Sequence, residues 1–247
     1  MRSRPDRTAW TSSRSAARSP RAGRRHRRAP LAGRRVAGEL SSHYARHIDF
    51  TIFQALNDLA ANHDALEDPL RFFALNAQYF FVALLAVLFL VRGKWRSENG
   101  RHGVVAAGFS ALLALGIAHL IADLWARPRP YVAHPDVHLF IARSHDTSFP
   151  SDHATAAFAL AVALLLRHRK AGWVALVLAT VMSIARVAVG THYPGDVLAG
   201  ALVGAAAALV LWHPSVRQPL HRLAEWAGRL YDRVAVAFLR RARLSFR

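Results

Sequence analysis

Three short clusters of arginine, histidine, serine and aspartate follow one another in the second half of the sequence. The first is Arg127-Pro128-Arg129-Pro130, the second is Ser148-Phe149-Pro150-Ser151-Asp152-His153, and the third is Arg186 followed by His192 and Asp196. Arginine binds phosphate through paired hydrogen bonds, and a neutral imidazole can act as a nucleophile. Side chains of these types could bind an anionic group and act on it as a nucleophile, an acid or a base.

The polypeptide around these clusters is strongly apolar. Of the 247 residues, 53% are hydrophobic. They gather into runs of about twenty, the length that an α-helix needs to cross a bilayer. The runs predict spans at residues 72–91, 104–125, 153–166, 172–190 and 194–212, of which the third is short. We expect an all-α fold, a polytopic membrane helix bundle of about five spans.

A shorter amphipathic segment precedes the first span. Ile48, Ile52, Phe53 and Leu56 fall on one stripe of a helix, but the segment is too short and too polar to cross a membrane. We expect it to be an N-terminal interfacial helix.

The basic residues divide the chain into three parts. The net charge is +18, and residues 1–47 hold +11 of it, with 13 arginines against two acidic residues. Residues 1–45 lack an apolar period and are expected to be a disordered Arg-rich arm. Residues 46–216 form the expected membrane domain, and residues 217–247 a basic amphipathic helix on anionic lipid. On so apolar a chain, the charge indicates membrane lipids as partners and not nucleic acid.

The basic loops also predict the topology. Loops rich in Lys and Arg stay in the cytoplasm, and residues 92–103 and 167–170 are such loops. The long loop 126–152 and the turn 191–194 then face outward, which brings the three clusters to one side of the membrane. The expected location is a multi-pass plasma-membrane protein with an extracytoplasmic site. The same topology places the basic N-terminus outside, against the positive-inside tendency.

Each cluster alone also has a structural interpretation. Arg-Pro repeats can mark a helix end, Pro-Ser-Asp-His is a normal helix start, and His192 and Asp196 could form a turn and a cap. These interpretations do not explain why cationic and imidazole groups gather on one side. Ionisable groups at membrane depth are costly and usually functional, so we assign the clusters to one site.

In this order and spacing the clusters resemble the signature of the type 2 phosphatidic acid phosphatase (PAP2) superfamily. That signature is Lys-x6-Arg-Pro, Pro-Ser-x-His and Ser-Arg-x5-His-x3-Asp. Arg129-Pro130, Pro150-Ser151-Asp152-His153 and Arg186-x5-His192-x3-Asp196 match it, within roughly residues 120–200. Upstream, Ile52-Phe53-Gln54-Ala55-Leu56-Asn57 is similar to the opening of bacterial undecaprenyl-diphosphatases of this superfamily. The resemblance implies a membrane lipid phosphatase.

Two positions depart from the signature. Ala122 stands where the family has its lysine, and Ala185 replaces the serine before Arg186. The missing lysine removes one expected phosphate contact. Arg127 is the nearest cation that could replace it, and whether it does so is left open.

The residues divide into roles that phosphoryl transfer requires. We expect His192 to be the nucleophile and Asp196, one helical turn later, to orient it by accepting its other ring N–H. Arg129 and Arg186 would bind the phosphate, with Arg127 as a further candidate, and Ser151 at a helix start would add a donor. His153 would protonate the leaving oxygen and later deprotonate water. No carboxylate cluster resembles a magnesium site, so we expect no metal and no cofactor.

The expected reaction is hydrolysis of the terminal phosphate of undecaprenyl diphosphate through a phosphohistidine. Phosphatidate or phosphatidylglycerol phosphate would fit the same site, because the motifs bind phosphate and say little about the lipid tail. A non-catalytic membrane scaffold or a lipid transporter is the alternative of another class. The sequence leaves the oligomeric state open.

Overall fold

The structure, a computed structural model, describes residues 31–90 and 98–216 together with scattered residues between 218 and 233. The chain divides into two compact units, Met1–Ser42 and His43–Arg247. The second unit holds the helix bundle and the site. Most of the predicted C-terminal helix, residues 217–247, lies outside the described residues.

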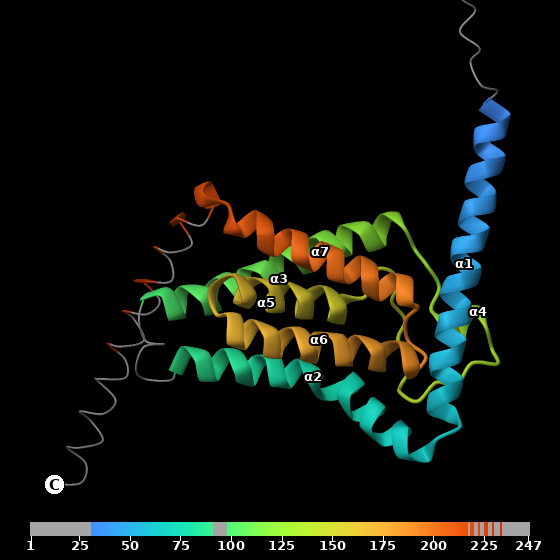
Figure 1. Cartoon of the computed structure of the whole chain (residues 1–247), viewed down its shortest axis with the longest axis horizontal. Helices are drawn as coiled ribbons and strands as arrows, with labels where there is room; N and C mark the ends of the chain where they lie inside the picture. The colour runs from blue at the N-terminus through green and yellow to red at the C-terminus, as the bar shows by residue number, and fades with distance from the viewer. Residues whose placement is uncertain are drawn as a thin grey trace, which may run out of the picture. The chain divides into compact units, whose positions relative to one another are not determined.

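The described residues form helices and no strands, which confirms the all-α prediction. The helices are α1 (Leu31–Ala61), α2 (Asp64–Leu90), α3 (Glu98–Leu124), α4 (Pro130–Ala133), α5 (Asp152–Arg167), α6 (Arg169–Ala188) and α7 (Pro194–Trp212). In Figure 1, α2, α3, α5, α6 and α7 run side by side as a bundle. Each of the five predicted spans corresponds to one of these helices.

Four helices of the described residues are long and apolar enough to cross a membrane on their own: α2, the part of α3 from Gly103, α6 and α7. The fifth predicted span corresponds to α5, which has only 16 residues. At about 1.5 Å per residue it is shorter than the hydrocarbon core of a typical bilayer. It packs on α3, α6 and α7, so neighbouring helices surround it.

Small residues let α5 and α7 approach closely. Five alanines of α5 are buried, and a Cβ at Gly204 of α7 would lie 2.4 Å from the carbonyl oxygen of Thr155. In membranes, helices associate through such close backbone packing and not through burial of large apolar side chains. This contact sets the spacing of the two helices that open at the site.

The chain turns sharply between α6 and α7. Gly190 has a φ of +90°, a conformation that side chains with a Cβ rarely adopt. The same glycine faces the carbonyl oxygen of His138, which a Cβ would approach to 2.3 Å. The turn directs the following residues, up to His192 and Tyr193, back over the end of the bundle.

The first helix begins earlier than expected. Residues 31–45 were expected to be disordered, but the structure has them as the beginning of α1. Leu, Ala, Arg and Glu, which are frequent there, favour a helix even without an apolar period. Of the predicted stripe, Phe53 is buried against the protein, together with Asn57 and Ala60, whereas Ile48 and Ile52 are exposed. Exposed apolar side chains are compatible with the predicted contact to the membrane interface, which stays a prediction.

Candidate active site

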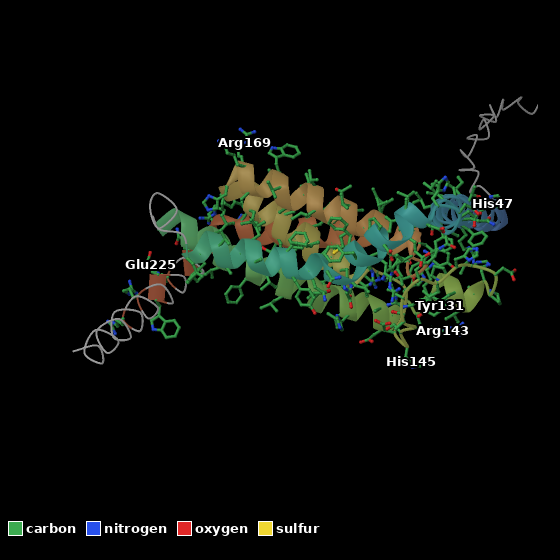
Figure 2. The ribbon with its side chains drawn as sticks, turned by 90° about the horizontal axis from the view of Figure 1, so that it is seen from below. His47, Tyr131, Arg143, His145, Arg169 and Glu225 are labelled. Atoms are coloured by element: carbon green, nitrogen blue, oxygen red, sulfur yellow. The ribbon has the colours of Figure 1, made fainter. Side chains whose placement is uncertain are left out.

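Four helix ends bring the predicted residues together at one end of the bundle, which we call the site end. Arg127 and Arg129 follow α3, Ser151 and His153 open α5, Arg186 lies in the last turn of α6, and Asp196 opens α7. Residues 125–151 connect α3 to α5 and include α4; we call this segment the outer loop after its predicted side of the membrane. Figure 2 shows Tyr131, Arg143 and His145 of that loop at the site end, with Arg169 at the opposite end.

His192 is fully enclosed and its ring is held from one side. Only 2% of the residue is exposed, and Nδ1 lies 2.8 Å from the backbone carbonyl oxygen of Ser148. A carbonyl can only accept, so Nδ1 carries the proton and donates. In the neutral ring Nε2 is then unprotonated and carries the lone pair that a nucleophile requires.

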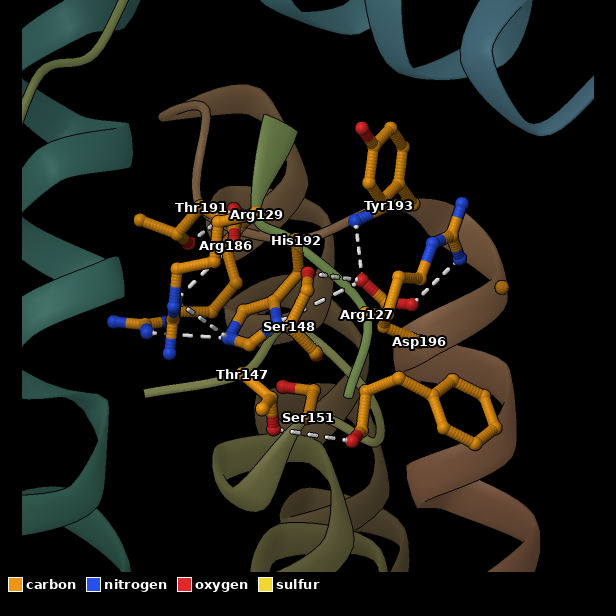
Figure 3. A network of polar contacts seen from close by, with 12 residues as sticks. Arg127, Arg129, Thr147, Ser148, Ser151, Arg186, Thr191, His192, Tyr193 and Asp196 are labelled. Carbon is orange, nitrogen blue, oxygen red and sulfur yellow. Dashed lines mark hydrogen bonds and ion pairs between the residues drawn. The ribbon is translucent and has the colours of Figure 1, made fainter. Parts of the chain in front are cut away.

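Two guanidinium groups donate hydrogen bonds to that lone pair. Arg186 Nη2 lies 3.3 Å and Arg129 Nη1 lies 3.4 Å from His192 Nε2 (Figure 3). Both arginines are buried, with 7% and 4% of the residue exposed. Two buried cations side by side are costly unless an anion joins them, so the pair is suited to bind a phosphate group.

The environment keeps His192 neutral. Burial lowers the pKa of His192 well below its usual value of 6.5, and the positive charges of Arg186 and Arg129 lower it further. A lowered pKa means that the ring is unprotonated at neutral pH. The nucleophilic form is therefore the resting form.

A cavity of about 310 Å³ opens beside these groups. Arg129, Arg186, His192 and His153 line it. His153 Nε2 lies 3.0 Å from Gln78 Oε1 of α2, so α2 contributes a polar contact to the site. The cavity brings a nucleophile, two cations and a second imidazole into contact with the same space.

Asp196 takes a different place from the expected one. Its Oδ2 lies 3.9 Å from His192 Nδ1, beyond hydrogen-bond distance, and instead accepts from Ser148 Oγ and from the backbone N–H of Tyr193 at 2.9 Å. The carboxylate is 0% exposed. Asp196 thus holds Ser148, whose carbonyl oxygen in turn holds His192.

Arg127 does not reach the cavity. Its guanidinium bonds Asp196 Oδ1 at 2.7 Å and Asp49 Oδ2 at 2.6 Å, and it lies 3.8 Å from the centre of the Tyr193 ring. These contacts hold the Arg127 guanidinium next to Asp196, away from the cavity. The structure therefore does not bring Arg127 to the place of the missing lysine, and Ala122 has no substitute among the cations that line the cavity.

Ser151 is buried at the start of α5 without lining the cavity. Its Oγ and the Nε of Arg186 are two buried polar atoms, within the described part of the chain, that have no hydrogen-bond partner. Unsatisfied buried donors are rare and call for an explanation. Of the two, only Arg186 lines the cavity, so the Nε of Arg186 is the unused donor that could serve an anion bound there.

Four residues of the site were missed by the sequence reasoning. Ser148 orients His192, Gln78 contacts His153, Asp49 binds Arg127, and Asp146 binds Arg129 Nη2 at 2.8 Å. Ser148 stands inside the second cluster, but its backbone carbonyl has no sequence signature. For Asp49 and Gln78, a polar residue in an amphipathic or apolar helix was the available signal.

Asp146 lines the cavity together with Asp152 and forms the ion pair with Arg129. It is more than half exposed, and its carboxylate also accepts a hydrogen bond from Ser144 Oγ. Although partial burial opposes it, hydrogen bonds from Ser144 and Arg129 and the charge of Arg129 keep the pKa of Asp146 below its usual range. Asp146 is thus a carboxylate that shares Arg129 with whatever anion enters.

The bundle and its site define a multi-pass membrane phosphatase. The chain belongs to the PAP2 superfamily, whose family model matches residues 103–218. It is 36% identical to the undecaprenyl-diphosphatase BcrC of Bacillus subtilis, over 63% of this chain and 78% of that protein. It is 32% identical to the bacitracin transport permease protein BcrC of Bacillus licheniformis, over 76% of this chain and 89% of that protein.

Solved structures agree with this membership. The crystal structure of LpxE from Aquifex aeolicus superposes with a TM-score of 0.54 at 25% identity, covering 65% of this chain and 92% of LpxE. The predicted membrane lipid phosphatase of the PAP2 superfamily is thereby confirmed.

Proposed function

We propose that this phosphatase removes the terminal phosphate of undecaprenyl diphosphate, with His192 as the nucleophile. The observation that carries the proposal is the setting of His192. Its Nδ1–H is held by Ser148, and its unprotonated Nε2 accepts hydrogen bonds from the guanidinium groups of Arg129 and Arg186. A phosphate bound between those cations would take over their hydrogen bonds and leave the lone pair available for attack.

In the first step, His192 Nε2 attacks the terminal phosphorus. The bond from that phosphorus to the bridging oxygen breaks, and Arg129 and Arg186 stabilise the charge on the equatorial oxygens. His153 gives a proton to the departing oxygen, so undecaprenyl phosphate leaves as a monoester. The free Nε of Arg186 adds a donor on the same side.

In the second step, water attacks the phosphohistidine. His153, now unprotonated, takes a proton from that water, and the N–P bond breaks to release inorganic phosphate. His192 returns to the neutral form with Nε2 free. Each turnover consumes one water and needs no group beyond the chain's own residues.

The lipid class is supported by two observations. The relative from Bacillus subtilis bears the name undecaprenyl-diphosphatase. On the side of α2, the cavity is lined by Ala74 and Leu75, together with Ile141 from the outer loop, so an apolar chain attached to the phosphate would find an apolar wall there.

The proposed location is the plasma membrane, with the site on the extracytoplasmic side. Two observations support it. The basic loops 92–103 and 167–170 favour the cytoplasm, and the second of them, between α5 and α6, lies at the bundle end opposite the site.

A side-by-side assay tests the substrate. Phosphate release by purified protein is measured on undecaprenyl diphosphate, phosphatidate and phosphatidylglycerol phosphate, with His192→Ala as the blank. The proposal expects the highest kcat/KM on the polyprenyl diphosphate. A higher kcat/KM on either glycerophospholipid would show that this lipid is the better substrate. If none of the three releases phosphate, a scaffold or transporter is favoured, and the name of the Bacillus licheniformis relative includes a transport role.

A further inference from the structure

We propose that Asp49 of α1 is a positioning residue for the nucleophile, which it reaches through Arg127, Asp196 and Ser148. The inference rests on the proposed role of His192 and extends the site to the N-terminal helix, outside the region that the family model matches. It makes α1 a part of the active site and not only a membrane contact.

Asp49 binds two elements of the site at once. Its Oδ2 accepts from Arg127 Nη2 at 2.6 Å, and its Oδ1 accepts from the backbone N–H of Gly195 at 2.6 Å. Gly195 lies in the first turn of α7, one residue before Asp196, and a Cβ there would lie 3.1 Å from the Asp49 carboxylate. The carboxylate therefore joins the residue after α3 to the start of α7.

Arg127 passes this restraint to Asp196. Its two terminal nitrogens are divided between the carboxylates of Asp49 and Asp196, and its guanidinium lies over the ring of Tyr193. A guanidinium with a fork of donors is fixed in orientation when both branches are bound. With Asp49 removed, one branch would lose its partner and Arg127 could rotate about the other.

Asp196 then fixes the groups next to His192. Its other oxygen accepts from Ser148 Oγ and from the Tyr193 N–H, and the Ser148 carbonyl oxygen accepts from His192 Nδ1. Figure 3 shows Arg127, Asp196 and Ser148 in line on the side of His192 away from Arg129 and Arg186. The network thus sets the angle of the ring without touching the phosphate cavity.

The rotation of α1 is itself fixed, so Asp49 is held in place. Asp49, Phe53 and Asn57 recur every four residues and share one face of the helix. Phe53 packs on Tyr193 at 5.6 Å between ring centres, and Asn57 Nδ2 donates to the carbonyl oxygens of His138 and Ala188 at 2.8 Å each. The helix is anchored to the outer loop and to the end of α6.

The test is Asp49→Asn, which keeps the shape of the side chain and removes its charge, with Asp49→Ala as the second variant. We expect kcat on the lipid diphosphate to fall by about ten-fold while KM stays within about twofold, because ring orientation and not phosphate binding is impaired. The inhibition constant for inorganic phosphate should also stay within about twofold, since Arg129 and Arg186 are outside the network. Asp58→Asn, an exposed acid on the same helix, is the matched control and should match the wild type.

A double-mutant cycle separates positioning from general stability. If Asp49 acts through Arg127, then Asp49→Asn combined with Arg127→Gln should be no slower than Arg127→Gln alone. Additive losses, or a normal kcat for Asp49→Asn, would overturn the inference. Active His192→Ala would instead overturn the proposed function, so the two failures are distinguishable. If Asp49→Ala fails to insert, Asp49→Asn still decides the question through kcat per inserted molecule.

Discussion

Ser148 holds the ring of His192 through its backbone carbonyl oxygen, which lies 2.8 Å from His192 Nδ1. The Asp196 carboxylate lies 3.9 Å from the same Nδ1 and binds the hydroxyl group of Ser148. The negative charge of Asp196, which would stabilise a positive charge on the His192 ring, is thus separated from the ring by Ser148. A backbone acceptor cannot be deleted by a side-chain substitution, which makes the tautomer of His192 resistant to mutation. The effects of substitutions at His192 and at Asp196 should therefore differ in kind.

His192→Ala removes the attacking atom. We expect phosphate release to fall almost to the blank while the protein still inserts, because the small side chain at this loop position leaves the helix packing intact. Release of phosphate is measured per molecule of inserted protein. A near-normal rate would remove His192 from the mechanism.

Asp196→Asn should reduce turnover without abolishing it. The amide keeps one acceptor oxygen but loses the charge that pairs with Arg127, so Ser148 is held less well. We expect a kcat between those of the wild type and His192→Ala. A variant as inactive as His192→Ala would show that Asp196 takes part in the chemistry directly.

Stability should depend on pH through His192. Its folded-state pKa is lowered well below 6.5, so as pH falls below about 6.5 the unfolded chain takes up a proton that the folded chain does not. The stabilisation is complete above the unfolded pKa and is lost as pH falls toward the folded one. Melting temperatures in detergent between pH 7.5 and 5 should decline, and His192→Gln should decline less steeply. His145→Gln, at an exposed loop position, is the control and should keep the wild-type slope.

The orientation of the site can be tested with the cysteine-free chain. His138 is exposed in the outer loop, and Arg169 is exposed at the opposite end of the bundle. The two test variants are His138→Cys and Arg169→Cys. In intact cells a membrane-impermeant thiol reagent should label the first and not the second, and lysis should expose both. The reverse pattern would turn the site toward the cytoplasm.

The N-terminal arm should be dispensable for catalysis up to Ser41. None of its residues matches the family signature, and Asp49, Phe53 and Asn57 all lie beyond it. A chain that begins at Ser41 should keep turnover per inserted molecule within about twofold, less than about half a kcal/mol of barrier.

A chain that begins at Asn62 is the counterpart of that truncation. It removes all three anchors and should lose activity even where it inserts. If the chain that begins at Ser41 inserts normally but its turnover falls ten-fold or more, the arm shapes the site.

The parts of the molecule that could be predicted from the sequence are those that repeat a pattern. Long apolar runs gave the positions of α2, α3, α6 and α7, and the spaced motifs identified His192, Arg129 and Arg186. The remaining site depends on which face of a helix meets which neighbour. The sequence placed Phe53 on an apolar stripe of α1, but it did not show that Phe53 and Asn57 would be buried against the protein while Ile48 and Ile52 stay exposed.

The polar contacts across helices were equally out of reach. Asp49 and Arg127 are 78 residues apart, and Gln78 stands alone in an apolar run, 75 residues before His153. No local pattern shows which residue either one meets, because these contacts depend on how α1 and α2 approach the ends of the other helices. The spacing of Asp49, Phe53 and Asn57 by four indicates a shared helix face, but such a face has many explanations.

The gathering of all reacting groups at one end of the bundle has a consequence for the lipid. A headgroup that reaches His192 belongs to the leaflet at that end, and hydrolysis moves none of the lipid's atoms to the other leaflet. The monophosphate product is therefore left facing the same aqueous compartment as the diphosphate was. Its reuse on the opposite side requires a separate transbilayer movement, so the phosphatase fixes the starting point of that movement but supplies no drive across the bilayer.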